Sequence, residues 1–163
     1  SWRVNDNLSF YGNIAWTDAK YEKFTGAPPA LEDSGGAVLV VDASGARLPG
    51  VSEWAASFGG EYTLPGEFSK RQGEWFVAAD ASYRSEFSSS PTESHYLNID
   101  GYTLVNLRAG FRSVDGWDLF GWTRNALDEE YFEMLNAGGS SSGYYAGLLG
   151  DPRTYGVTLR GSF

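Results

Sequence analysis

The sequence contains no cysteine and only one histidine. The lack of cysteine excludes a disulfide framework and any metal site built from thiolates. The single histidine, His95, lies in the polar segment SSSPTESHYLN, where only Glu93 is nearby as a second ligand, so we expect no metal site there. Long apolar runs are missing as well. The longest aliphatic run, AVLVV at residues 37–41, is far too short for a membrane-spanning helix.

Basic residues are scarce relative to acidic ones. The chain has 12 Lys and Arg against 21 Asp and Glu, which gives a net charge of -9. Binding to nucleic acid requires a basic face for the phosphates, so nucleic acid is not an expected partner. The acidic run DEEYFE at residues 128–133 lacks the spacing of a calcium loop, and we interpret it as the solvated base of a loop. We expect no catalytic residues, no cofactor and no enzymatic activity.

Helical periodicity is weak, and an alternation of apolar and polar residues takes its place. In the segment at residues 75–84, for example, Trp75, Val77 and Tyr83 fall on one side and Asp80 and Arg84 on the other. Such alternation is typical of strands with two unlike faces. Six segments of about 9–11 residues show it, which is the length of a strand that crosses a bilayer at a tilt. The segments are residues 8–16, 54–62, 75–84, 103–112, 117–125 and 153–163.

Aromatic residues stand at the ends of these segments, on the apolar side. Pairs such as Trp54 with Tyr62, Trp75 with Tyr83, and Tyr155 with Phe163 mark both ends of a strand, as the interfacial aromatic girdles of membrane barrels do. The connections alternate in length. We expect a long loop, a short turn, a medium loop, a tight turn and a long loop at residues 18–52, 64–73, 85–101, 113–116 and 126–152.

These features predict an all-β fold: a segment of an antiparallel transmembrane β-barrel with about six long amphipathic strands in a meander. Alternating long loops and short turns are typical of outer-membrane barrels, and they place both chain ends on the periplasmic side. The alternative is a small soluble or surface β-sandwich that binds carbohydrate through exposed aromatic residues. Sandwich strands also alternate, but their apolar faces are buried against each other.

Two stretches near the end of the chain resemble a known family. They are DGYTLVNLRAGFRSVDGWDLFGWTRNALDEEYF at residues 100–132 and GDPRTYGVTLRGSF at residues 150–163. Both are similar to the carboxyl-terminal end of TonB-dependent outer-membrane receptors. In that family an Asn-Leu-x-Asp-x-x-Tyr segment follows the penultimate strand. Here Asn125, Asp128 and Tyr131 match it with Ala126 in place of Leu, or Leu127 matches the Leu with one extra residue after Asn125. The last strand of the family often begins Gly-x-Pro-Arg-x-Tyr and ends in Phe.

The resemblance implies an outer-membrane receptor of a Gram-negative bacterium that takes up a scarce nutrient, most often a ferric siderophore. Family members have a plug domain and a barrel of 22 strands. We therefore expect residues 1–163 to be the carboxyl-terminal portion of such a barrel, without the plug. The implied partners are outer-membrane lipid, the remainder of the barrel, the plug, TonB acting through the plug region, and the barrel assembly machinery. The final strand resembles the assembly signal that this machinery reads, carried by Tyr155, Val157, Leu159 and Phe163.

Two further groups of residues are candidate sites. The polar sides of the strands carry charges expected to line the lumen, where they either satisfy one another or contact the plug or an anionic ligand. They are Asp80, Arg84, Arg108, Arg124 and Arg160. The loop tip at residues 138–150 carries Tyr144 and Tyr145, which we expect to contribute to ligand capture unless the loop is simply variable.

Overall fold

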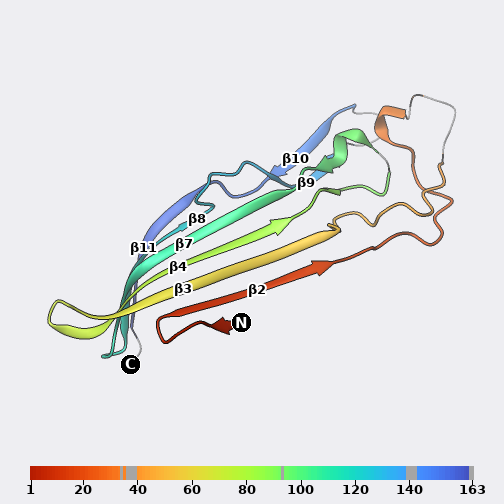
Figure 1. The fold of residues 1–163 in the computed structure, drawn as a ribbon. Coiled ribbons are helices and arrows are strands. Elements are labelled where there is room, and N and C mark those ends of the chain that lie inside the picture. Colours follow the sequence, from red (N-terminus) through yellow and green to blue (C-terminus); the bar gives the residue numbers. More distant parts are fainter. Residues whose placement is uncertain (34, 36–39, 93, 139–142, 162–163) are drawn as a thin grey trace.

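The computed structural model describes residues 1–33, 35, 40–92, 94–138 and 143–161. One long antiparallel sheet of seven strands dominates it, in the order β1-β2-β3-β4-β7-β8-β11 (Figure 1). The order of the strands across this sheet is their order along the chain, so the predicted meander is confirmed. The strands are β1 (Trp2–Arg3), β2 (Leu8–Trp16), β3 (Trp54–Phe68), β4 (Arg71–Arg84), β7 (Tyr102–Ser113), β8 (Trp117–Arg124) and β11 (Thr154–Gly161).

The remaining elements belong to the long connections. Two small antiparallel pairs form there, β5 (Phe87–Ser88) with β6 (Asn98–Ile99) and β9 (Phe132–Ala137) with β10 (Tyr145–Leu149). Two short 3₁₀ turns, η1 (Leu31–Asp33) and η2 (His95–Leu97), complete them. These elements gather at one end of the sheet, and the β3–β4 and β7–β8 turns and the last residues of β11 lie at the other (Figure 1). We call these the loop end and the turn end.

None of the described helical segments is long and apolar enough to cross a membrane.

The register of the ladder collects the apolar residues on one face. Trp75 lies opposite Phe111, and Phe111 lies opposite Leu119, which in turn faces Leu159 of β11. Apolar side chains in the middle of the strands are largely exposed, with Ile14 at 64%, Phe58 at 53% and Val77 at 59%. The two small sheets belong to the connections at the loop end, so a β-sandwich, which would bury these residues, is not formed.

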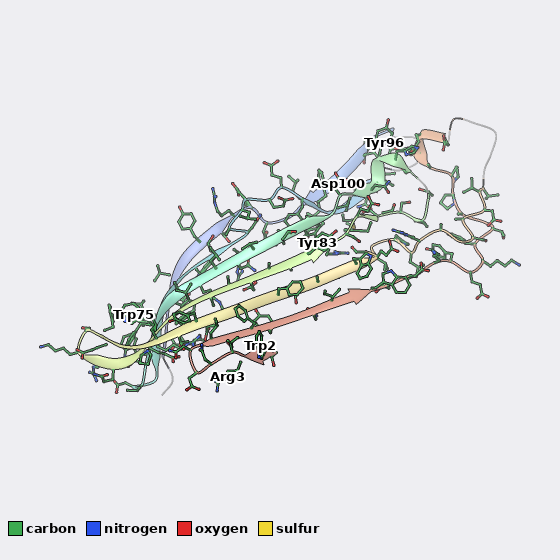
Figure 2. All side chains as sticks on the ribbon, viewed as in Figure 1. Trp2, Arg3, Trp75, Tyr83, Tyr96 and Asp100 are labelled. Atoms are coloured by element: carbon green, nitrogen blue, oxygen red, sulfur yellow. The ribbon has the colours of Figure 1, made fainter. Side chains whose placement is uncertain are left out.

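Aromatic residues border this apolar face at two levels. Trp16 pairs with Trp54 at the loop end, and Tyr83 lies one strand further along. Trp75 lies near the turn end and Tyr83 towards the loop end of the same strand (Figure 2). Eight residue steps separate them, about 26 Å along the strand, comparable to the reach of a strand of 9–11 residues that crosses a bilayer. The expected positions near strand ends are confirmed for Trp75 with Tyr83 and for Trp16 and Trp54. Tyr62 instead lies inside β3, because that strand continues to Phe68, and Phe163 lies outside the described residues.

The turn expected at residues 64–73 lies within that range but is shorter than expected, because β3 and β4 continue through most of it. Their connection is only Ser69 and Lys70, both with positive φ, at 51° and 63°, as a two-residue hairpin of the primed kind requires. Pro65 and Gly66 suggested an earlier turn. Thr63 donates its backbone N–H to the carbonyl of Asn7, the residue just before β2 begins. The nitrogen of Pro65 points to the same side of β3, where no residue of β2 remains to pair with it. The lack of an N–H at Pro65 therefore removes no hydrogen bond from the ladder.

Two other expectations about the connections need correction. Residues 126–152 are not a plain loop, because they contain the β9–β10 hairpin, and the 85–101 connection contains β5, η2 and β6. The count of six strands omitted β1, a two-residue strand that pairs with β2 through Trp2 opposite Phe10. These short strands were missed because each has too few residues to reveal an alternation of apolar and polar residues. The tight turn in SVDG is confirmed, with Gly116 at a φ of 86°.

A cluster of aromatic rings closes the turn end of the apolar face. Phe111 is its centre and is 1% exposed. Its ring centroid lies 5.2 Å from that of Trp75, 5.7 Å from Phe68 and 5.8 Å from Trp117. Phe68 reaches the cluster because β3 extends to the hairpin turn. The neighbouring turns are also joined by an ion pair of 2.9 Å between Arg71 and Asp115.

We predict that Phe111→Ala lowers the free energy of unfolding by about 3–5 kcal/mol, since it removes a ring packed by three others and leaves a cavity. The measurement is urea unfolding in detergent micelles, followed by tryptophan fluorescence. Val114→Ala, at a side chain that is 76% exposed in the adjacent turn, is the control and should change stability by less than about 0.5 kcal/mol. Equal effects of the two substitutions would contradict a central role for Phe111.

Candidate binding surfaces

Opposite the apolar face, the polar face of the sheet forms a shallow hollow. Strands β4, β7, β8 and β11 each contribute alternate residues to it, and its volume is about 610 Å³. Four of the five residues expected in a lumen wall line this one hollow, namely Asp80, Arg108, Arg124 and Arg160. Phe120 and Trp122 provide its aromatic part. The alternation in the sequence therefore brings together residues that lie up to 80 positions apart.

Two of these charged residues have partners within the face. Asp80 accepts a hydrogen bond of 2.7 Å from the side-chain amide of Asn106, and Arg160 forms an ion pair of 3.2 Å with Asp118. Among the residues that the structure describes, Arg108 and Arg124 take part in no ion pair. The guanidinium of Arg124 lies 5.3 Å from the centre of the Trp122 ring. The face thus combines paired charges with two arginines that can accept a further anionic group.

Arg84 does not join the hollow. It lies at the loop end of β4, where its guanidinium donates hydrogen bonds to the Ser52 hydroxyl at 3.2 Å and to the Gly50 carbonyl at 2.9 Å. It also lies 4.2 Å from the centre of the Phe87 ring. Its contacts therefore fix the end of the long 17–53 connection against the sheet.

Near the turn end, Arg112 forms the densest charge cluster of the polar face. It pairs with both carboxylate oxygens of Glu61 at 2.7 Å and with Glu74 at 3.1 Å. The guanidinium lies 4.1 Å from the centre of the Phe76 ring. This bidentate geometry joins three strands through side chains. The sequence indicated the polar face but not which residues on it would pair.

Asn125 ties together the segment that resembles the family motif. It is 5% exposed and adopts a φ of 48° directly after β8. Its side-chain amide donates to the carbonyls of Glu129 at 2.9 Å and Asp151 at 3.1 Å, and its side-chain oxygen accepts from the Glu129 N–H at 2.9 Å. One asparagine thus joins both ends of the β8–β11 connection.

The other motif residues complete this loop base. Asp128 accepts a hydrogen bond of 3.1 Å from the Arg153 N–H and forms an ion pair of 3.4 Å with its guanidinium. The Tyr131 ring stacks on Tyr102 at 4.4 Å and also lies against Gly150, where any Cβ would collide with it. The described residues contain no group of three His, Asp or Glu side chains suited to a metal ion. The acidic run therefore begins with a structural contact at the base of the loop.

At the loop end, the carboxylate of Glu32 joins three separate connections. It accepts hydrogen bonds from the Tyr145 hydroxyl at 2.6 Å, the Ser94 hydroxyl at 3.0 Å and the His95 N–H at 3.0 Å. Ser94 is 1% exposed and also caps η2. Tyr96, labelled at the loop end in Figure 2, stacks on Tyr145 with ring centroids 5.0 Å apart. We call Glu32, Ser94, Tyr96 and Tyr145 the Glu32 junction.

The contacts of the junction change the titration of its members. The Tyr145 hydrogen bond is the main reason that the pKa of Glu32 is lowered to about 2, and the hydroxyl of Ser94 and the N–H of His95 act in the same direction. The same hydrogen bond raises the pKa of Tyr145, because it favours the protonated phenol beside a carboxylate. At neutral pH the junction therefore holds an ionised Glu32 and a neutral Tyr145.

The two tyrosines expected to capture ligand occupy different environments. Tyr144 is exposed, whereas Tyr145 begins β10 and is half-buried in the Glu32 junction. Of the residues expected in an assembly signal, Tyr155, Val157 and Leu159 lie on the apolar face of β11, at 81%, 76% and 72% exposure. Phe163 lies outside the described residues. His95 takes part in the junction through its backbone N–H.

We predict that Asn125→Gly and Asn125→Ala both loosen the base of the β8–β11 connection, and that Ala does so more strongly. Both lose the side-chain hydrogen bonds, but glycine tolerates a positive φ, whereas alanine adds a strain of about 1–2 kcal/mol. The measurement is the rate of trypsin cleavage after Arg153, which should rise in the order native, Gly, Ala. A native cleavage rate in Asn125→Gly would show that the hydrogen bonds do not hold this base.

We predict that Glu32→Gln shifts the pKa of Tyr145 downwards, towards its ordinary value of 10.0. The measurement is an absorbance titration, with the Tyr145→Phe variant subtracted to isolate this phenol. The raised pKa of Tyr145 stabilises the folded state below pH 10.0, and this stabilisation is lost as the pH rises through the raised value. The lowered pKa of Glu32 stabilises the folded state above pH 4.5, and this stabilisation is lost as the pH falls towards 2. An unchanged Tyr145 pKa would contradict the junction.

Comparisons with known proteins agree with this architecture. The family model described as TonB dependent receptor-like, beta-barrel, matches residues 1–126. No curated protein sequence matches the chain significantly. Among solved structures, the ferric yersiniabactin uptake receptor FyuA from Yersinia pestis superimposes with a TM-score of 0.71 at 15% identity, over 99% of this chain and 22% of the receptor.

A second solved structure is the siderophore receptor PiuA from Acinetobacter baumannii, with a TM-score of 0.64 at 17% identity, over 96% of this chain and 19% of the receptor. This chain therefore spans about a fifth of the length of both receptors. At these identities the likeness to the two structures concerns the fold. The match to the family model covers most of the sequence, and it shows that the chain belongs to the TonB-dependent receptor β-barrel family.

Proposed function

We propose that this chain is the carboxyl-terminal portion of the barrel of an outer-membrane receptor in a Gram-negative bacterium. The receptor takes up a scarce nutrient, most often a ferric siderophore, and the inner membrane supplies the energy through TonB and the plug domain. The membership of the family supports the receptor class. The siderophore and the coupling to TonB are our inference from that family and from the named functions of the two similar receptors.

The observation that carries this proposal is the exposed apolar face of the main sheet. It is continuous from β2 to β11, is bordered by aromatic residues at two levels, and leaves Ile14, Phe58 and Val77 uncovered. In water such a face would aggregate, whereas in lipid it is the surface that a transmembrane strand requires. The polar groups of the strands lie on the opposite face, where they face the interior of the barrel.

The edges of the sheet indicate where the rest of the barrel joins. In the described part of the chain β11 pairs only with β8, and β2 pairs on its outer side only with the two residues of β1. Strands in lipid need every backbone N–H and C=O paired, so open edges in a membrane require further strands. The share of the two similar receptors that this chain covers supports the same view.

The hollow on the polar face would then be part of the lumen wall. Asp80 and Arg160 have partners within the face, an amide and a carboxylate, and Arg108 and Arg124 supply positive charge to a group inside the barrel, which we assign to the plug. Arg84 instead anchors an external connection. The apolar side chains of β11 would present the assembly signal to the barrel assembly machinery, with Phe163 at its end.

The external connections would supply the ligand-binding part. Tyr96 and Tyr144 are exposed at 62% and 58%, and Tyr145 stacks on Tyr96 beside them. Exposed aromatic rings on connections that a rigid sheet holds in place suit capture of an amphipathic ligand. This retains the expected role for Tyr144 and Tyr145 and adds Tyr96, which lies far from them in the sequence.

We predict that the receptor containing this chain restores iron uptake to cells whose own ferric-siderophore receptors have been deleted. The measurement is the accumulation of radioactive iron from a panel of ferric siderophores, with matched cells that lack TonB as the control. Uptake should require TonB and an energised inner membrane. Recovery of the protein in the soluble periplasmic fraction, or uptake that is equal without TonB, would contradict the proposal.

A further inference from the structure

The negative charge of the chain is concentrated at the loop end. Fourteen of the 21 Asp and Glu residues, but only four of the 12 Lys and Arg, lie in the connections at residues 17–53, 85–101 and 125–153. The remaining part of the chain is therefore close to neutral, although the net charge of the whole is -9. A surface with such an excess of one sign attracts ligands of the opposite sign and repels those of its own.

Glu32 combines this charge with the exposed aromatic residues. Its carboxylate is exposed and accepts the Tyr145 hydroxyl at 2.6 Å, and Tyr145 in turn stacks on Tyr96. The contact bridges residues 113 positions apart in the sequence. The hydroxyl of Ser94 and the N–H of His95, at the start of η2, donate hydrogen bonds to the same carboxylate. The position of the two rings relative to each other therefore depends on a charged group beside them.

We propose that Glu32 is a positioning and specificity-determining residue of the outer binding surface. It holds the rings of Tyr96 and Tyr145 together as a platform for an aromatic ring of the ligand, and its charge selects a ligand that carries no net negative charge. The inference rests on the proposed function, since it concerns the ligand of the same receptor. It assigns that ligand to neutral, aromatic ferric complexes such as those of phenolate siderophores.

The physical basis is the proximity of charge and rings. A ligand that stacks on Tyr96 or Tyr145 lies within a few ångströms of the Glu32 carboxylate, well inside the screening length of about 8 Å at physiological salt. A complex with three negative charges is then repelled by Glu32 and by the acidic surroundings, whereas a neutral complex loses nothing. Tyrosine rings stack equally well with either ligand, so the charge decides between them.

The test compares two radioactive iron complexes in cells that produce the receptor containing this chain. One is a neutral ferric phenolate siderophore complex, and the other is a ferric tris-catecholate complex with three negative charges. We expect TonB-dependent uptake of the neutral complex to exceed that of the tris-catecholate by about tenfold. In Glu32→Gln, this ratio should fall at least threefold, and the fall should shrink as salt is added. The ratio within one variant does not depend on how much receptor reaches the membrane.

Asp33→Asn is the matched control, because it removes the same charge from the next residue of η1 without touching Tyr145. It should lower the ratio much less than Glu32→Gln does, because only Glu32 lies beside the two rings. Tyr145→Phe keeps the ring and the Glu32 charge but breaks their hydrogen bond, so it should slow uptake of the neutral complex while uptake of the tris-catecholate stays low. An equal loss of selectivity in Asp33→Asn and Glu32→Gln would overturn the specific role of Glu32.

The outcomes separate this inference from the proposed function. Uptake that depends on TonB but favours the tris-catecholate complex overturns the inference and leaves the receptor assignment intact. Failure to take up any complex of the full siderophore panel overturns the proposed function, and the inference with it. A native preference for the neutral complex that Glu32→Gln reduces supports both.

Discussion

The unbroken hydrogen-bond ladder of the main sheet is the constraint on which the other features depend. Pairing runs without a shift of register through β2, β3, β4, β7, β8 and β11, and the one register shift in the described residues lies in the β9–β10 hairpin, between Leu148 and Leu149. Side chains alternate between the faces, so a slip of one residue in any strand would move its apolar set to the polar face. The apolar residues of one face and the charged residues of the other therefore fix the same register.

Close packing of aromatic rings on glycines reinforces that register. On the polar face the ring of Tyr11 lies over Gly59, and on the apolar face the ring of Phe58 lies against Gly12 of the neighbouring strand. A Cβ at either glycine would collide with the ring, so each pair fits in one alignment of the two strands. These contacts act across β2 and β3, near an edge of the sheet, where fewer neighbouring strands hold the pairing.

The features that could be predicted from the sequence are those that repeat along it, such as the alternation within a strand, whereas contacts that occur once could not be predicted. Period-two alternation located β2 at its observed bounds and placed Asp80, Arg108, Arg124 and Arg160 on one face, because a regular pattern persists along a strand. The β3–β4 turn was expected to be longer than it is because Pro65 and Gly66 are common turn residues, although both belong to β3. Glu32 gave no signal, since its partners Ser94 and Tyr145 come from other connections and no spacing relates them.

The connections at the loop end are joined to one another mainly by side chains, in contrast to the sheet below them. The Glu32 junction links three connections through a single carboxylate, and Asn125 closes the third connection at its base. A substitution in the junction can therefore alter what the loop end binds without breaking a ladder bond, while the base keeps the connection anchored to β8 and β11. Substitutions on the apolar face and substitutions at the loop end therefore act on separate sets of contacts.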